Sequence, residues 1–85
     1  MLMGELFRIN NRIRILIYSN DHKPAHVHVI VRAEGIEFKV FLADFSCEHI
    51  TEKQLSARDE KMVIQFIEKN KNFIMEAWNE IQKDQ

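Results

Sequence analysis

Residues 25–42 read AHVHVIVRAEGIEFKVFL, and the alternation within this stretch decides the fold. Apolar side chains recur at every second position on both sides of Ala33-Glu34-Gly35, which is the spacing of two half-buried β-strands. A glycine in so short a connection is typical of a hairpin turn. The pattern therefore predicts two antiparallel strands that place one face on a hydrophobic core.

The residues before this stretch extend the same pattern. Isoleucine alternates with other side chains over residues 12–18, and a shorter alternation covers residues 7–9. Asn10-Asn11, between these runs, can adopt left-handed backbone angles and favours a tight turn. We expect a meander of three to five strands. Three interpretations of residues 44–50 stay open: an edge strand, a bulged continuation of the preceding strand, or a loop.

The second half of the chain changes to a helical period. Apolar residues recur at three- and four-residue spacings from Met62 to Ile81. Ser56 followed by Asp59 resembles a helix N-cap with an acidic third residue. The spacing predicts one long helix from Ala57 to Gln82 that packs on one face of the sheet. The expected fold class is therefore α+β, with residues 1–85 forming a single domain.

Composition narrows the class of protein. The net charge is −1, with 46% hydrophobic and 29% charged residues, which is ordinary for a folded protein. A protein that coats nucleic acid is normally basic, so only a local basic patch could serve that purpose. The single cysteine, Cys47, excludes an internal disulfide and favours a reducing compartment. We expect no signal peptide, no membrane span and a cytoplasmic location, because no long apolar run is present.

Three of the four histidines lie within seven residues, at positions 22, 26 and 28. Side chains two apart on a strand point the same way, so His26 and His28 share a face with Cα atoms about 6.5–7 Å apart. Asp21 and His22 precede the strand, and Pro24 stiffens the approach to it. Two imidazoles placed in this way can converge on one small species.

A metal site is one interpretation of this segment. His26 and His28 would supply two nitrogen ligands to a divalent ion such as zinc. His22, Asp21 or a carboxylate on the facing strand would supply the third. Three protein ligands with one open position are typical of catalytic zinc.

Three further interpretations stay open, and whether the protein is an enzyme stays open with them. In an acid–base site, one imidazole removes a proton and the other donates one, with RNA cleavage as the chemistry and Lys23, Arg12 or Arg14 holding phosphate. In a recognition surface, the histidines and Tyr18 bind a partner chain. In the structural interpretation, the histidines only organise the turn through hydrogen bonds.

The segment Ile17–Val29, IYSNDHKPAHVHV, also resembles the hallmark of a bacterial family of unknown function, DUF4160. Its members typically show Tyr-x-Asp/Asn-Asp/Glu-His-x-Pro-x-His-Val-His. The C-terminal half is similar as well, through Leu55-Ser56-Ala57, residues 66–70 and Trp78. Two positions depart from the pattern, since Lys23 and Ala25 stand where relatives often carry proline. We therefore expect a looser turn here, with a positive charge beside the site.

The resemblance implies a function. Members are often encoded beside a second short protein, an arrangement similar to a type II toxin–antitoxin pair with the histidine-bearing protein as toxin. It therefore implies a toxin that binds a small antitoxin-like protein and acts on nucleic acid or a nucleotide. The alternatives are a non-enzymatic interaction module with structural histidines and a small metal-binding protein. The functional positions implied by motif match are Tyr18, Asp21, His22, Pro24, His26 and His28.

Association with another chain is a further expectation. Leu16 and Phe41 fall on the sheet face away from the predicted helix, mixed with charged residues. A second copy in a homodimer, or a partner chain, could cover that face.

Overall fold

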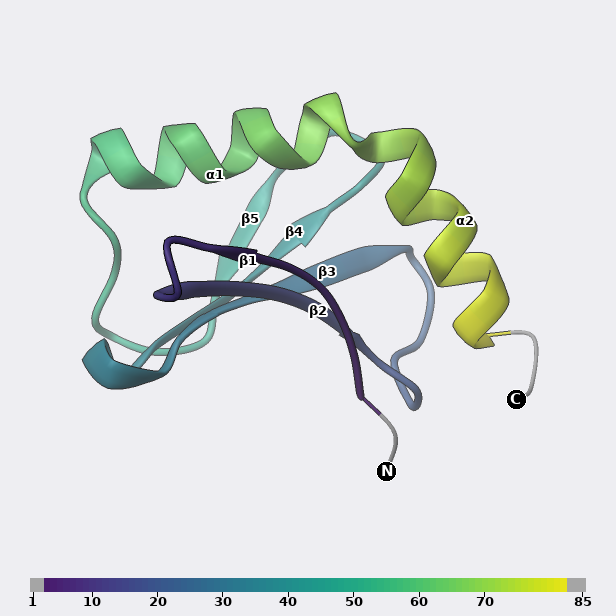
Figure 1. The fold of residues 1–85 in the computed structure, drawn as a ribbon, viewed down its shortest axis with the longest axis horizontal. Coiled ribbons are helices and arrows are strands. Elements are labelled where there is room, and N and C mark those ends of the chain that lie inside the picture. Colours follow the sequence, from purple (N-terminus) through teal and green to yellow (C-terminus); the bar gives the residue numbers. More distant parts are fainter. Residues whose placement is uncertain (1–2, 83–85) are drawn as a thin grey trace.

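A computed structural model describes residues 3–82 and shows one antiparallel sheet with helices on one side of it (Figure 1). The sheet is a meander in which neighbouring strands follow one another in the chain. Its strands are β1 (Met3–Ile9), β2 (Ile13–Tyr18), β3 (His26–Val31), β4 (Ile36–Phe41) and β5 (Cys47–His49). A 3₁₀ turn, η1 (Arg32–Glu34), joins β3 to β4. The predicted α+β class is confirmed, and residues 44–50 contain an edge strand.

The local signals at the turns act as the sequence predicts. Asn10 and Asn11 both have a φ of 54°, and Gly35 has a φ of 65° after η1. The Ser56 hydroxyl accepts a hydrogen bond from the Asp59 backbone N–H at 3.1 Å and caps the first helix. These turns fix the length of each strand and therefore the register of the sheet.

The helical half begins and ends at the predicted residues but forms two helices, α1 (Ala57–Lys69) and α2 (Lys71–Gln82). Asn70 lies between them with φ −106° and ψ 19°. Its side-chain amide donates to the Phe66 carbonyl at 2.8 Å, a local bond that competes with regular helix geometry. The chain bends there, and α2 descends past one end of the sheet (Figure 1). Within residues 3–82, neither helix combines the length and the apolar composition needed to cross a bilayer.

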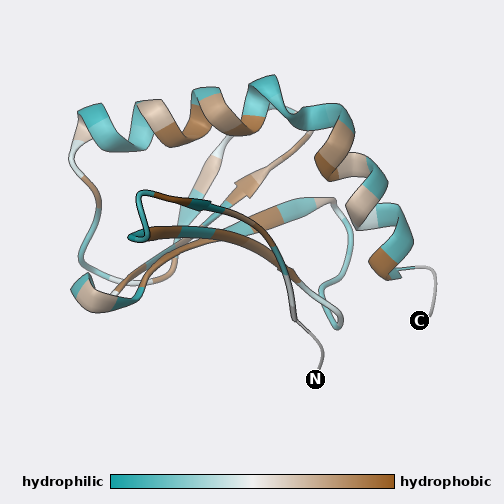
Figure 2. Ribbon diagram, viewed as in Figure 1, coloured by the Kyte–Doolittle hydropathy of each residue, from teal (hydrophilic) through white to brown (hydrophobic). Residues whose placement is uncertain are grey.

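The hydrophobic core lies between the helices and the sheet face turned toward them (Figure 2). Ile15, Val29 and Phe38 come from three adjacent strands and have no exposed surface. Buried side chains from α1 and α2 complete the core: Val63, Ile67, Ile74 and Trp78. Because strand side chains alternate, His26 and His28 belong to the other face of β3. Packing in the core therefore holds β3 in place, and the histidines project from the opposite face of that strand.

Candidate metal centre

The candidate site forms where the turn after β2 folds against the first residues of β3. Asp21 is held in this turn by two bonds to Tyr18, the last residue of β2. Its Oδ2 atom accepts a hydrogen bond from the Tyr18 backbone N–H at 2.9 Å. Its own N–H donates to the Tyr18 carbonyl at 3.1 Å. An aspartate that bonds its own turn in this way is held rigidly, so its second oxygen has a defined position.

Both imidazoles lie beside that second oxygen. Asp21 Oδ1 lies 3.1 Å from His28 Nε2 and 3.5 Å from His26 Nε2, and the histidine ring centroids are 5.2 Å apart. One ligand atom from each of the three residues falls within 4.8 Å of the other two. Around a tetrahedral zinc ion with bonds of about 2.0–2.1 Å, ligand atoms lie about 3.3 Å apart. The two distances to Asp21 therefore match the edges of a zinc coordination polyhedron.

The tautomer of His26 follows from its backbone partner. His26 Nδ1 lies 2.8 Å from the Pro24 carbonyl oxygen, which can only accept, so Nδ1 carries the proton. In the neutral ring, Nε2 then presents a lone pair. His26 is only 4% exposed, and its Nε2 is buried without a hydrogen-bond partner in the described structure. A buried lone pair beside a carboxylate oxygen costs free energy, and a cation between the two atoms would remove that cost.

His28 lies between two carboxylates. Its Nδ1 is 3.1 Å from Glu37 Oε2, and its Nε2 is 3.1 Å from Asp21 Oδ1. A neutral imidazole has one N–H, so only one of these contacts can be a hydrogen bond unless the ring is doubly protonated. If Nδ1–H donates to Glu37, Nε2 is a free ligand atom. A histidine ligand commonly donates its other N–H to a carboxylate in this way.

The surroundings of the cluster are aromatic and tightly packed. The Tyr18 ring lies edge-on to His28, with centroids 4.6 Å apart, and the Trp78 ring lies 5.3 Å from His26. Burial, with smaller contributions from the charges of Glu37 and Asp21, raises the pKa of the Tyr18 hydroxyl. Tyr18 is therefore a neutral phenol at physiological pH and packs against the site as a wall.

A pocket of about 330 Å³ adjoins the cluster. Asp21 and His26 line it, so it opens directly onto two of the three ligand residues. His22 is exposed on its wall instead of joining the ligand atoms. The other lining residues are Asn20, Lys23, Pro24, Lys39 and Phe41. The turn therefore supplies one ligand and most of one pocket wall.

The two arginines predicted to hold phosphate are engaged elsewhere. Arg12 pairs with Glu34 and Asp59, and Arg14 lies 3.5 Å from a Glu5 carboxylate oxygen. Neither arginine is among the residues that line the pocket. Of the predicted phosphate-binding residues, only Lys23 is brought to the site.

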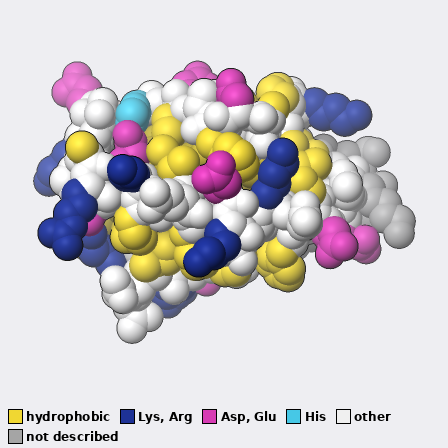
Figure 3. Space-filling model, turned by 90° about the horizontal axis from the view of Figure 1, so that it is seen from above, with side chains coloured by type: hydrophobic (Ala, Val, Ile, Leu, Met, Phe, Trp, Pro, Cys, Tyr) yellow, Lys and Arg dark blue, Asp and Glu magenta, His cyan; other side chains and the backbone are white. Residues whose placement is uncertain are grey.

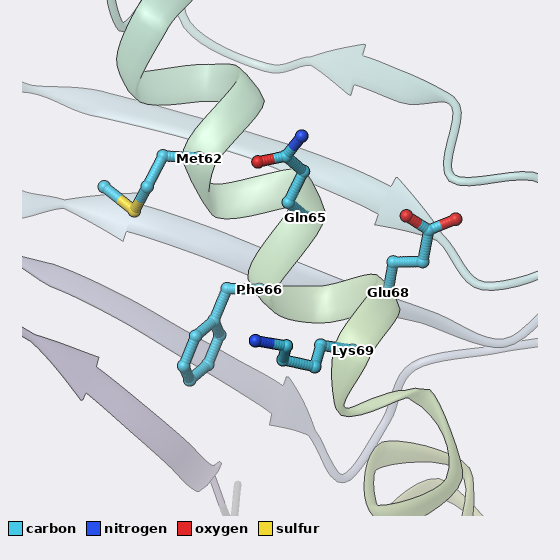
Figure 4. Close-up of a pocket in the computed structure, with 5 residues that line it drawn as sticks. All are labelled: Met62, Gln65, Phe66, Glu68 and Lys69. Carbon is cyan, nitrogen blue, oxygen red and sulfur yellow. The ribbon is translucent and has the colours of Figure 1, made fainter.

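A larger hollow of about 490 Å³ lies along α1, and we do not take it as the site (Figure 4). Met62 and Phe66 point to one side of α1 and Glu68 to the other (Figure 4). The face above the helices carries scattered apolar and charged side chains (Figure 3). None of the residues that line this hollow belongs to the group of potential metal ligands found among residues 3–82. The chemistry of the lining residues, rather than the volume, is the reason for choosing the smaller pocket as the candidate site.

Sequence reasoning left three neighbours of the site unassigned. Glu37 and Lys39 alternate on β4 beside the histidine strand, and Lys39 pairs in register with His28. The alternation of β4 places both residues on the face away from the helix, and a carboxylate on the facing strand is among the predicted metal ligands. The register that sets Lys39 opposite His28 could not be read from the sequence. Trp78 lies far away in the sequence and reaches His26 only because the chain bends at Asn70, which no periodicity reveals.

Comparison with known proteins gives a family without an activity. A family model described as "Domain of unknown function (DUF4160)" matches residues 13–79. The match therefore spans more than half of the chain, from β2 to α2, and includes the whole candidate site. No curated protein and no solved structure matches significantly.

Proposed function

The chain belongs to the DUF4160 family, and we propose that it binds a divalent metal ion of the zinc type through Asp21, His26 and His28. The buried, unpartnered Nε2 of His26 carries this proposal. When His28 donates its Nδ1–H to Glu37, its Nε2 lone pair and that of His26 face the same Asp21 oxygen at 3.1 and 3.5 Å. Three electron-rich atoms repel one another in a buried space, and a shared cation removes that repulsion.

The surrounding groups support the ion as well. The Pro24 carbonyl accepts from His26 Nδ1, and the Glu37 carboxylate can accept from His28 Nδ1 in the tautomer that leaves Nε2 free for a metal. Such outer partners orient metal ligands and increase their basicity. With three protein ligands, a zinc ion keeps a fourth position for water and increases the acidity of that water. Asp21 and His26 line the pocket, so a metal ion that they held would be accessible from it and could supply an activated water, which supports hydrolytic chemistry.

Metal content tests the proposal directly. Protein purified without a histidine tag should hold about one equivalent of zinc, and cobalt(II) should replace it with the visible absorption of a tetrahedral site. His26→Ala should lose the metal and the absorption band. His49→Ala is the matched control, because His49 lies on the edge strand β5 and contacts Glu60 of α1 instead of the cluster. Sub-stoichiometric metal with no cobalt spectrum would contradict the proposal and favour metal-free acid–base or structural histidines.

The wider role that we propose is a toxin that acts on nucleic acid or a nucleotide and is neutralised by a small antitoxin-like partner. The resemblance of the Tyr18–His28 motif motivates this role. Support from the site is chemical: a metal-activated water suits phosphate-ester hydrolysis, and Lys23 and Lys39 on the pocket wall suit an anion. The small antitoxin-like partner is the one implied by the resemblance, and no surface of this protein is assigned to it.

Growth on induction tests the wider role. The wild type should arrest growth, while a folded His26→Ala, His28→Ala double variant should not. If a second short protein is encoded beside the gene, its co-expression should relieve the arrest. Equal arrest by the double variant would separate toxicity from the site, and the interaction module would then be the better explanation.

A further inference from the structure

We infer that the pocket beside the metal cluster binds the phosphate group of a small phosphate ester, of the size of a single nucleotide. This inference rests on the proposed metal site and names the class of ligand that the site takes. One phosphate oxygen would occupy the open position on the ion. Lys23 and Lys39 would hold the others.

The two lysines are available for a ligand. Both line the pocket, and neither forms an ion pair with any side chain of residues 3–82. Glu48 lies opposite Lys39 in the β4–β5 register, yet the described structure shows no ion pair between these two side chains. The described arginines Arg8, Arg12 and Arg14 are paired with carboxylates in contrast. Arg32, Arg58 and the other lysines of residues 3–82 form no ion pair either, so Lys23 and Lys39 are distinguished by their position, because both line the pocket beside Asp21 and His26.

The charge of the pocket selects an anion. Asp21 is the only carboxylate among the lining residues, and a divalent ion would neutralise it with positive charge to spare. The amide of Asn20 and the imidazole of His22 add further hydrogen-bond donors. Metal ions and lysines together are a common means of binding transferable phosphate. A dianionic phosphate monoester satisfies this excess of positive charge better than a neutral or singly charged ligand.

The size and the apolar wall select the rest of the ligand. At about 330 Å³, the pocket lies at the lower end of the range of about 300–1,000 Å³ for small-molecule sites. Phe41 and Pro24 form its apolar part, and the Phe41 ring lies 5.7 Å from that of His26. An aromatic side chain gives a base a surface for stacking, whatever the identity of the base. A mononucleotide, or the end of a strand, fits this description.

Calorimetry with zinc-loaded full-length protein tests the inference, with adenosine monophosphate, inorganic phosphate and adenosine as probes. The monophosphate and inorganic phosphate should bind, and adenosine should bind at least about tenfold more weakly, the scale of one charge-assisted hydrogen bond. Lys23→Met and Lys39→Met should each weaken monophosphate binding by about tenfold. Lys61→Met, an exposed lysine on α1, is the matched control and should leave binding unchanged.

Two outcomes would overturn the inference while leaving the metal site intact. The first is binding of adenosine as tightly as of the monophosphate. The second is unchanged monophosphate binding by a Lys23→Met, Lys39→Met double variant that retains one equivalent of zinc. Failure of the metal site itself would appear earlier and separately, as the absence of zinc or of the cobalt spectrum in the unliganded protein.

Discussion

Two polar clusters lie at opposite ends of the sheet, and they differ in exposure and in their number of hydrogen-bond donors. At the η1 end, the Arg12 guanidinium pairs with Glu34 and Asp59, and these side chains are 39%, 36% and 34% exposed. At the other end, the side chains of His26, His28 and Asp21 are 5%, 7% and 11% exposed. The first cluster is a solvated ion-pair network, and the second is largely buried, although Asp21 and His26 line the adjoining pocket.

The number of hydrogen-bond donors in each cluster explains why the difference between the clusters bears on function. A guanidinium carries five N–H donors and can satisfy two carboxylates without help. In the second cluster, neutral His26 has already given its N–H to the Pro24 carbonyl, so Asp21 and both Nε2 atoms share too few protons. Burial makes that deficit costly, whereas water would relieve it at the surface. This shortage of donors is what supports the proposed cation site.

The largest expected difference between the two clusters is in their effect on zinc affinity. Asp21→Asn keeps the shape of the side chain but removes the charge and one ligand oxygen, so zinc affinity should fall by more than about 100-fold, beyond the range for outer partners. Glu34→Gln makes the same chemical change in the other cluster and should leave affinity unchanged. Competition with a chromogenic chelator measures both. Equal affinities in the two variants would remove Asp21 from the ligand set.

The second largest effect is expected on thermal stability, which bound zinc should increase. A ligand that binds only the folded state at 100 times its Kd stabilises it by about 2.7 kcal/mol. For a domain of this size, that corresponds to a rise in Tm of roughly 10–20 °C. Thermal unfolding with zinc and with a chelator measures the rise, and His26→Ala should show none. A Tm that ignores zinc would mean that the three atoms are not arranged for an ion.

A smaller effect should appear at Glu37, which lies outside the ligand set. Glu37→Gln weakens the acceptor that orients His28, so zinc affinity should fall by about 10- to 100-fold while one equivalent still binds. Glu48→Gln removes an exposed carboxylate from the neighbouring strand β5 and serves as the control. Complete loss of zinc in Glu37→Gln would instead make Glu37 a direct ligand.

The sequence predicts most of the fold because its signals are local. The period of two over residues 25–42, the two asparagines at the first turn and the Ser56 cap each depend on neighbouring residues. The same holds for His26 and His28, whose shared face follows from strand geometry alone. The break between α1 and α2 was missed, because Asn70 is tolerated inside many helices and the apolar period continues on both sides of it; the local bond from its side chain to the Phe66 carbonyl leaves no mark in that period.

What the sequence could not decide was which of several polar neighbours completes the site. His22 and Asp21 are adjacent on the turn, and only the two bonds to Tyr18 place Asp21 over the histidines. The arginines presented the same difficulty, since charge alone made Arg12 a candidate for phosphate. Its partners Glu34 and Asp59 come from η1 and α1, so their effect depends on tertiary structure. Ligand choice is therefore a long-range property, whereas the face of the strand is a local one.

The smallest expected effect lies in the exposed cluster and has a definite sign with pH. Hydrogen bonds from Arg12 lower the pKa of the Glu34 carboxyl, so the folded state binds fewer protons there than the unfolded chain. The contribution of Glu34 to stability is therefore present above its unfolded pKa of about 4.3–4.5 and is lost as the pH falls through the lower folded value. Glu34→Gln should reduce the urea midpoint slightly at pH 7, less in 1 M salt, and not at all in strong acid. A difference that persisted unchanged into acid would mean that Glu34 acts through packing, and the exposed cluster would then resemble the buried one more closely than its donors suggest.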